Sequence, residues 1–172
     1  MENKFDAIVV GTGISGGWAA KELTEKGLKT LVLERGRMIN HIDDYHTANM
    51  DPWDFKGGDT ITQDAYKRQP KQSRTGYVNT ESSRHFFVDD LEHPYNDDKN
   101  KFNWIRGYHV GGRSLTWGRH TYRLSEFDFE ANLKDGIAVD WPIRYKDIAP
   151  WYDYVEQYIG VQGRYEGLPQ FP

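Results

Sequence analysis

The sequence predicts an α/β fold that begins with a strand–helix–strand unit, and three observations support this prediction. Residues 5–10 and 29–34 are short apolar runs rich in β-branched side chains, as buried strands are. Residues 14–26, between them, carry small side chains at helical spacing. The three segments together span 30 residues, and a crossover of this kind is nearly always parallel and right-handed. We therefore expect a βαβ unit.

Each boundary of this unit has a local signal. The first run stops at Gly11, and its unbroken apolar character is typical of a strand buried on both faces of a parallel sheet. The helix has a narrow stripe, at spacings of four, three and four, that would lie close against the sheet. The stripe consists of Gly16, Ala20, Leu23 and Gly27. Gly27 also ends the helix, because glycine readily adopts the left-handed conformation found after a helix C-terminus.

The remainder of the chain is less regular. Between residues 37 and 103 no period persists, so we expect long loops with short elements, one of them a strand at 86–88. Near the end, Asp147 is placed to cap a helix, with Pro150 in its first turn and Gly160 as its stop. The predicted parts are a βαβ core, a loop-rich insertion, a second glycine-rich segment and a helix-containing segment, at 1–36, 37–103, 104–125 and 140–160.

Composition excludes several classes of function. Lys and Arg number 22 against 26 Asp and Glu, a net charge of −4, so the positive charge that nucleic acids or anionic lipids attract is missing. No apolar run approaches the ~18 residues of a membrane span, and residues 1–6 lack the features of a signal peptide, so we expect a cytoplasmic protein. Because the chain has no cysteine, disulfides, thiolate chemistry and Cys-bearing metal sites are excluded.

The turn between the first strand and the helix has the pattern of a phosphate-binding loop. Its sequence is G-x-G-x-x-G, formed by Gly11, Thr12, Gly13, Ile14, Ser15 and Gly16. In a Rossmann-like unit, which binds FAD or NAD(P), the first glycine makes the tight turn and the second lets backbone amides approach a pyrophosphate. The third glycine allows close helix–strand contact. The helix N-terminus adds unpaired N–H groups and a partial positive charge, so an acidic protein can bind two phosphates without a lysine.

Glu34 supplies the second part of a dinucleotide site. It ends the second strand, 18 positions after Gly16, where this fold places an acid that accepts hydrogen bonds from the adenosine ribose. A 2′-phosphate would meet this carboxylate, so NADP is disfavoured. The spacing does not distinguish FAD from NAD. The alternative is a simple glycine turn with a solvated acid at the strand end.

A second glycine-rich segment follows about ninety residues later, at 107–118 (GYHVGGRSLTWG). Its Gly-Gly pair followed by Ser114 lets backbone donors approach a ligand closely. Together with GTGISGG at the first turn, ERG at 34–36 and DWPI at 140–143, it resembles the glucose-methanol-choline (GMC) family of FAD-dependent oxidoreductases. The likeness is to the N-terminal portion of its sugar-oxidising branch, which includes pyranose oxidase, gluconate dehydrogenase and glucoside 3-dehydrogenases.

The resemblance implies a set of cofactor contacts. The residues at the pyrophosphate of FAD would be Gly11, Gly13, Ile14, Ser15 and Gly16. Glu34 would hold the adenosine ribose, and Arg35 would lie beside the adenine. The pyrophosphate and the flavin ring would also be lined by Gly112, Ser114, Thr116 and Trp117. Because Thr116 stands where some relatives carry the histidine that binds FAD covalently, the resemblance implies noncovalent FAD. Arg113 is either another cofactor contact, or a solvated loop residue or the partner of a carboxylate.

The resemblance also implies a reaction. The family oxidises a CH–OH group, here of a sugar or polyol, by hydride transfer to flavin N5, with a histidine as the base. That base lies in a C-terminal substrate domain, which we expect to be absent here, so the fragment is predicted to be inactive alone. An electron-accepting partner protein is a further expectation. Two alternatives stay open: an NAD-binding dehydrogenase fragment, and a non-catalytic nucleotide-binding or interaction module.

None of the six histidines is assigned to catalysis or to a metal. His41 and His46 lie five positions apart in an Asp-rich stretch, but neither a third ligand nor a helical period supports a metal pair. His109 and His120 flank the second glycine-rich segment, where ordinary hydrogen-bonded loop histidines are the expected case.

Overall fold

The computed structural model describes residues 4–76, 78–168 and 170. The chain forms two compact units, Met1–Trp117 and Gly118–Pro172, which we call the N-terminal and C-terminal units. The glycine-rich segment predicted at 104–125 is divided between them. In the described part of the chain, no helix is long and apolar enough to cross a membrane.

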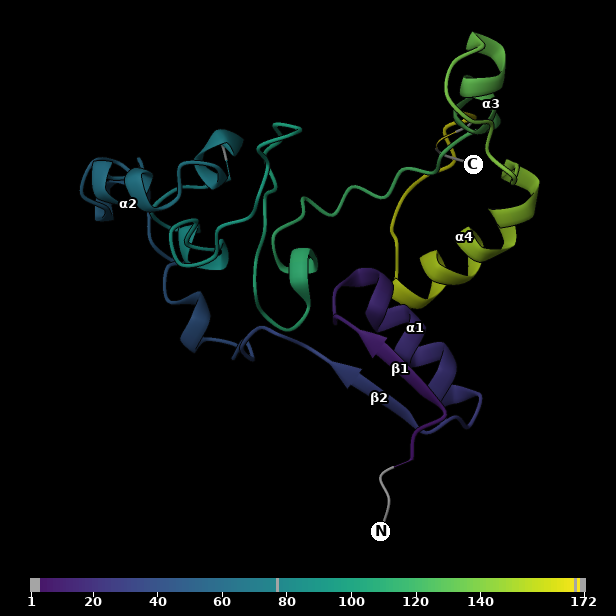
Figure 1. The fold of residues 1–172 in the computed structure, drawn as a ribbon, viewed down its shortest axis with the longest axis horizontal. Coiled ribbons are helices and arrows are strands. Elements are labelled where there is room, and N and C mark those ends of the chain that lie inside the picture. Colours follow the sequence, from purple (N-terminus) through teal and green to yellow (C-terminus); the bar gives the residue numbers. More distant parts are fainter. Residues whose placement is uncertain (1–3, 77, 169, 171–172) are drawn as a thin grey trace. The chain divides into compact units, whose positions relative to one another are not determined.

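The N-terminal unit begins with the predicted βαβ arrangement (Figure 1). Strand β1 (Ala7–Val10) and strand β2 (Thr30–Leu33) pair in parallel, and helix α1 (Ile14–Glu25) connects them. The register places Ala7 beside Thr30 and Val10 beside Leu33. Both strands are shorter than the apolar runs that predicted them, because pairing is limited to four residues on each side.

Helix α1 ends as its sequence predicts. Gly27 has a φ of 84°, and its N–H donates to the carbonyl of Thr24 at 2.9 Å. The N–H of Leu28 reaches back to the carbonyl of Leu23 at 3.1 Å. These two bonds form a Schellman motif, which satisfies carbonyl groups that the end of a helix would otherwise leave unpaired.

The prediction that β1 is buried on both faces is wrong. Val9 faces α1 and is 8% exposed, whereas Ile8 and Val10 point to the other face and are 61% and 81% exposed. Successive side chains of a strand alternate between the two faces of the sheet. Helix α1 packs on both strands and covers one of these faces, and the side chains of β1 on the other face are exposed.

Between β2 and the second glycine-rich segment, the described residues of the N-terminal unit form loops, short 3₁₀ turns and one short helix, α2 (Gln63–Arg68). The strand predicted at 86–88 is wrong, since Arg84–Phe86 forms a 3₁₀ turn. Phe86, Phe87 and Val88 are nevertheless among the most buried apolar side chains of the chain. Their apolar run therefore indicated burial, and the loops around them provide it in place of a sheet.

The C-terminal unit contains two helices, α3 (Glu126–Asp135) and α4 (Tyr145–Ile159). Helix α3 was not predicted, although Ser125 donates from its backbone N–H to the carboxylate of Asp128 at 2.7 Å, as at many helix starts. Gly136, with a φ of 65°, ends it. Phe129 is buried and meets the Trp141 ring edge-on, with 5.9 Å between centroids.

Helix α4 begins earlier than predicted and ends at Gly160 as predicted. Arg144, rather than Asp147, occupies the cap position, and the carboxylate of Asp147 accepts a hydrogen bond from the Arg144 backbone N–H at 2.8 Å. Pro150 consequently lies inside the helix and not in its first turn. It removes one backbone hydrogen bond. Because Pro150 and Lys146 are exposed, water can reach the unpaired carbonyl of Lys146.

Arg123 ties the start of the C-terminal unit to α4. Its Nε donates to Glu156 Oε1 at 2.8 Å, and its Nη2 donates to Asp153 Oδ1 at 2.7 Å. Its Nη1 donates to the hydroxyl of Tyr145 at 3.1 Å. These bonds raise the pKa of Arg123 above its usual range, with the bond to Glu156 as the largest cause.

Candidate nucleotide-binding site

The turn after β1 requires glycine at two positions. Gly11 has a φ of 92°, a left-handed conformation that other residues rarely adopt, and its N–H donates to the carbonyl of Leu33 at 2.7 Å. A Cβ atom on Gly16 would lie 2.0 Å from the carbonyl oxygen of Gly11. The first turn of α1 therefore packs directly on the end of β1, as the third glycine of the motif predicted.

The N-terminus of α1 presents free backbone donors to an open space. Gly17 makes the first bond of the helix, from its N–H to the carbonyl of Gly13 at 2.8 Å. Within the described part of the chain, the amides of Ile14, Ser15 and Gly16 have no hydrogen-bond acceptor, as is normal for a first helical turn. A Cβ atom on Gly13 would meet nothing within 4 Å. The space above Gly13 is thus free for a ligand.

Glu34 lies beside this turn, and its carboxylate accepts hydrogen bonds from it. Its Oε2 accepts hydrogen bonds from the backbone N–H and the hydroxyl of Thr12, at 2.9 and 2.6 Å. Its Oε1 accepts from the N–H of Gly36 at 2.8 Å. These bonds, led by that of the Thr12 hydroxyl, lower the pKa of Glu34 to about 2, so the carboxylate is ionised at neutral pH. A carboxylate has about four acceptor positions, which leaves one for a ligand hydroxyl.

The second glycine-rich segment meets the first turn. Val110 donates its N–H to the carbonyl of Arg37 at 2.9 Å, and Gly111 donates to the Thr12 hydroxyl oxygen at 3.1 Å. A Cβ atom on Gly112 would lie 3.1 Å from the Cα of Gly13. Two segments 99 residues apart in sequence are therefore in direct backbone contact at the mouth of α1.

Thr12 is the central residue of this arrangement, and sequence reasoning missed it. Its hydroxyl donates to Glu34 and accepts from Gly111, so it joins β1, β2 and the second glycine-rich segment. Gly36 was noted as part of the ERG motif, but its close packing against the second glycine-rich segment was not predicted. A Cβ atom there would lie 2.1 Å from the backbone nitrogen of His109. The only available signals were a hydroxyl side chain between two glycines and a glycine directly after Glu34-Arg35.

The predicted residues after Gly112 lie on one short turn or directly after it. Gly112–Leu115 is a 3₁₀ turn that packs against α1. Within it, the Ser114 hydroxyl donates to the carbonyl of Gly111 at 2.6 Å and so stabilises the turn itself. Thr116 follows the turn, and Trp117 is 38% exposed. Arg113 is exposed, with its guanidinium 5.2 Å from the centroid of the Phe87 ring.

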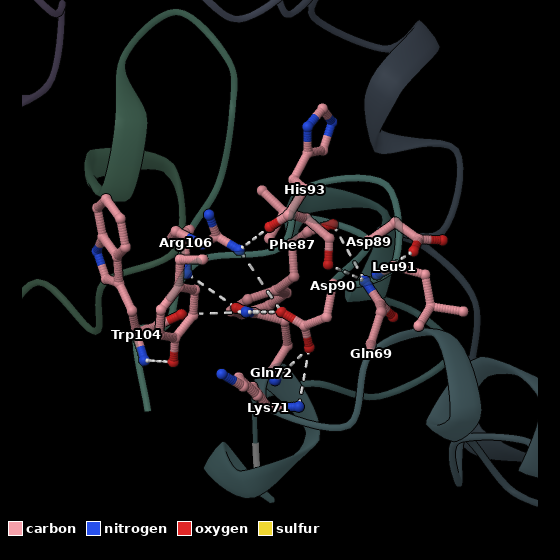
Figure 2. A network of polar contacts seen from close by, with 12 residues as sticks. Gln69, Lys71, Gln72, Phe87, Asp89, Asp90, Leu91, His93, Trp104 and Arg106 are labelled. Atoms are coloured by element: carbon pink, nitrogen blue, oxygen red, sulfur yellow. Dashed lines mark hydrogen bonds and ion pairs between the residues drawn. The ribbon is translucent and has the colours of Figure 1, made fainter. Parts of the chain in front are cut away.

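A buried polar network fixes the loops that lead to this segment (Figure 2). The carboxylate of Asp90 accepts hydrogen bonds from the Lys71 backbone N–H and from Gln72 Nε2, each at 2.8 Å. Gln72 Oε1 accepts from the backbone N–H of Arg106 at 2.8 Å, and the Arg106 guanidinium donates to the carbonyl of His93. Because Gln72 and Arg106 are buried, these bonds hold the start of the second segment in place.

The histidines do not gather at the turn. His109 is buried, and its Nε2 lies 3.2 Å from the carbonyl oxygen of Phe86, as for a hydrogen-bonded structural histidine. His46 lies beside His85, with 5.0 Å between the centroids of the tilted rings, and burial lowers the pKa of His85. His41 instead lies beside Tyr45. In residues 4–76, 78–168 and 170, no group of three or more potential ligands is arranged to hold a metal ion.

Nearly the whole chain is similar to parts of several known proteins, at low sequence identity. No protein-family model matches it. It is 27% identical over 164 residues to the 6'''-hydroxyparomomycin C oxidase of Streptomyces lividus, covering 92% of this chain and 23% of the relative. The match to the gluconate 2-dehydrogenase flavoprotein of Pantoea cypripedii is 28% over 172 residues, 93% of this chain and 26% of that protein.

The chain is similar to oxidoreductases. A further match, the fructose dehydrogenase large subunit of Gluconobacter japonicus, is 26% identical over 161 residues, 92% of this chain and 27% of the subunit. The names of these relatives refer to oxidation of sugars or sugar-containing compounds, and one name states that the protein is a flavoprotein. The chain spans about a quarter of the length of the curated relatives it matches.

Proposed function

We propose that the N-terminal unit binds FAD noncovalently at the mouth of α1. The observation that carries this proposal is the meeting of three features: the free amides of Ile14, Ser15 and Gly16, the open space above Gly13, and the ionised carboxylate of Glu34. The amides would hold the pyrophosphate, and the free acceptor position of Glu34 would receive a ribose hydroxyl. Gly11 and Gly112 keep side chains out of this space.

The remaining contacts concern the adenine and flavin ends of the cofactor. Arg35 follows Glu34 and is exposed, which suits a contact with the adenine. The turn that carries Ser114, together with Thr116 and Trp117 directly after it, would line the pyrophosphate and flavin. Attachment is proposed to be noncovalent because Thr116 offers no imidazole for a bond to the flavin.

We infer further that the chain is the FAD-binding part of a GMC-type oxidoreductase that oxidises a CH–OH group of a sugar or polyol. The names of the relatives support this substrate class. Bound flavin would supply the hydride acceptor at N5. The residues of this chain would bind and orient the cofactor, and none is assigned as the base. A partner protein that accepts electrons is part of the proposal, because one relative is named as a subunit.

The test compares FAD binding by the 172-residue chain with that of two glycine variants. Gly13 has a φ of −65° and a ψ of −175°, so Gly13→Val places its side chain in the open space without backbone strain. Gly163→Val is the matched control, because a Cβ atom there also meets nothing within 4 Å and its φ is not positive. Affinity is measured by the change in flavin fluorescence on titration.

We expect Gly13→Val to lose FAD binding by more than about 100-fold and Gly163→Val to bind within about twofold of the wild type. Glu34→Ala should weaken binding by about tenfold, the effect of losing one charged hydrogen bond. Equal FAD affinity in Gly13→Val and the wild type would refute the site. Binding of NAD but not FAD would favour an NAD-dependent dehydrogenase fragment, and binding of neither would favour an interaction module.

A further inference from the structure

Tyr108 covers one face of Arg35. The guanidinium carbon of Arg35 lies over the Tyr108 ring, 3.7 Å from its centroid, well within the range of a cation–π pair. The backbone favours this pairing, since Arg37 and His109 form a parallel bridge that places residue 108 opposite Gly36, next to Arg35. A Cβ atom on Gly36 would lie 2.2 Å from the carbonyl carbon of Tyr108, so the backbones of the two segments are in close contact here.

The Tyr108 ring is itself held on two further sides. Its hydroxyl accepts a hydrogen bond from Arg106 Nη1 at 2.7 Å, and its ring meets the His93 ring edge-on, with 4.9 Å between centroids. Arg106 is only 5% exposed and belongs to the buried network with Gln72 and Asp90 (Figure 2). The position of the ring is therefore fixed by the interior of the unit and not by solvent-exposed contacts.

Arg35, in contrast, is exposed and is next to Glu34 in the chain. A long arginine side chain in solvent samples many rotamers, and fixing it on binding costs affinity. Stacking on an anchored ring removes part of this cost before a ligand arrives. It leaves the second face of the planar guanidinium directed away from the ring, and a guanidinium plane stacks well on an aromatic base.

We propose that Tyr108 is a positioning residue of the nucleotide site, which holds Arg35 as a flat platform for the purine base of the bound dinucleotide. This inference rests on the proposed function. It adds a residue from the second glycine-rich segment that takes no part in phosphate or ribose binding. Contact with the purine base is assigned to Arg35, which is positioned by Tyr108 and through it by Arg106. Contact with the phosphates is assigned to the amides of α1.

The test uses two probes that separate these contacts, ADP and inorganic pyrophosphate, with the 172-residue chain and isothermal titration calorimetry. Tyr108→Leu removes the aromatic face, and we expect about fivefold weaker ADP binding with pyrophosphate binding unchanged. Tyr108→Phe keeps the face and should bind ADP within about twofold of the wild type. Arg35→Lys keeps the positive charge but lacks the planar guanidinium group, and it should weaken ADP binding as much as Tyr108→Leu does.

A double-mutant cycle checks that Tyr108 acts through Arg35. In an Arg35→Ala background, Tyr108→Leu should cause no further loss of ADP affinity, because the platform is already gone. Independent, additive losses would overturn the proposal, as would wild-type affinity in Arg35→Lys. Equal losses for ADP and pyrophosphate would also overturn it, since they would indicate a general structural role.

Two results bear on the ligand class. Tighter binding of adenosine 2′,5′-bisphosphate than of ADP would show that Arg35 pairs with a phosphate group and would overturn the stacking role.

If the wild type binds neither ADP nor pyrophosphate, the proposed function fails first. If the wild type binds ADP and the Tyr108 variants bind it equally well, the proposed function stands and only this inference fails. Should Tyr108→Leu not fold, Arg35→Lys still decides, because wild-type ADP affinity in that variant overturns the proposal.

Discussion

Replacing Thr12 with valine removes one hydroxyl group while it keeps the shape of the side chain. That hydroxyl donates to Glu34 at 2.6 Å and accepts from the N–H of Gly111 at 3.1 Å. The variant therefore breaks two contacts that join three segments of the N-terminal unit. The backbone bond from the Thr12 N–H to Glu34, at 2.9 Å, is left in place.

The expected cost follows from these two bonds. A hydrogen bond to a charged group contributes about 1.5–3 kcal/mol, and the neutral bond from Gly111 contributes about 1 kcal/mol. Both bonds are only partly buried, so water replaces part of the lost interaction. We expect Thr12→Val to lower the free energy of unfolding by about 2 kcal/mol at neutral pH, as measured by urea denaturation of the 172-residue chain.

The pH dependence gives a sharper check. The pKa of Glu34 is lowered from 4.5 to about 2, mainly by the Thr12 hydroxyl, so Glu34 stabilises the fold above pH 4.5. This stabilisation is lost as the pH falls from 4.5 towards about 2. In Thr12→Val the pKa of Glu34 should rise, and the difference in unfolding free energy between variant and wild type should narrow over the same range. NMR titration of the Glu34 side-chain carbonyl carbon measures the pKa directly.

Thr24→Val is the matched control, because the Thr24 hydroxyl makes only exposed bonds to carbonyls of its own helix, Ala20 and Lys21. It should change the unfolding free energy by less than about 0.5 kcal/mol, with no dependence on pH between 2 and 5. An unchanged Glu34 pKa in Thr12→Val would refute the reasoning. A loss of stability that stays constant from pH 6 to pH 3 would refute it as well.

Three further predictions concern stability. Gly16→Ala should cost about 3 kcal/mol in urea denaturation, since its Cβ would overlap a backbone carbonyl, whereas Gly17→Ala, which meets open space, should be neutral or stabilising. Asp90→Asn should lower the unfolding free energy by about 2–4 kcal/mol, because an amide cannot accept all the hydrogen bonds that the buried carboxylate does. Arg123→Met should cost about 3 kcal/mol and speed hydrogen exchange within 118–168, while the exposed Arg164→Met should change the exchange little.

Local sequence signals predicted the βαβ unit well. The apolar runs, the glycine pattern and Gly27 each act through residues within about one helical turn, so their effect does not depend on the rest of the chain. The same is true of Gly160 at the end of α4. Glu34 was also placed correctly at the mouth of the turn, because its distance from Gly16 is set by the length of one helix and one strand.

The errors share a physical cause. The run 86–88 was predicted as a strand because strands and buried loops can have the same apolar composition, and only the partners decide between them. The prediction that both faces of β1 are buried was wrong for the same reason, since burial depends on what packs against a strand. Helix α3 was missed although Ser125 and Asp128 carried a capping signal, because its apolar period is weak.

By itself, the sequence determined the order of β1, α1 and β2, the glycine turn between them, and the acid at the end of β2. Only the tertiary structure decided that Thr12 joins Glu34 to Gly111, and that Tyr108 lies on Arg35. The reason is the separation of the partners. Bonds within a turn are fixed by local backbone geometry. A contact between residues 12 and 111 forms only when the loops from 37 to 106 fold around the buried network of Asp90 and Arg106.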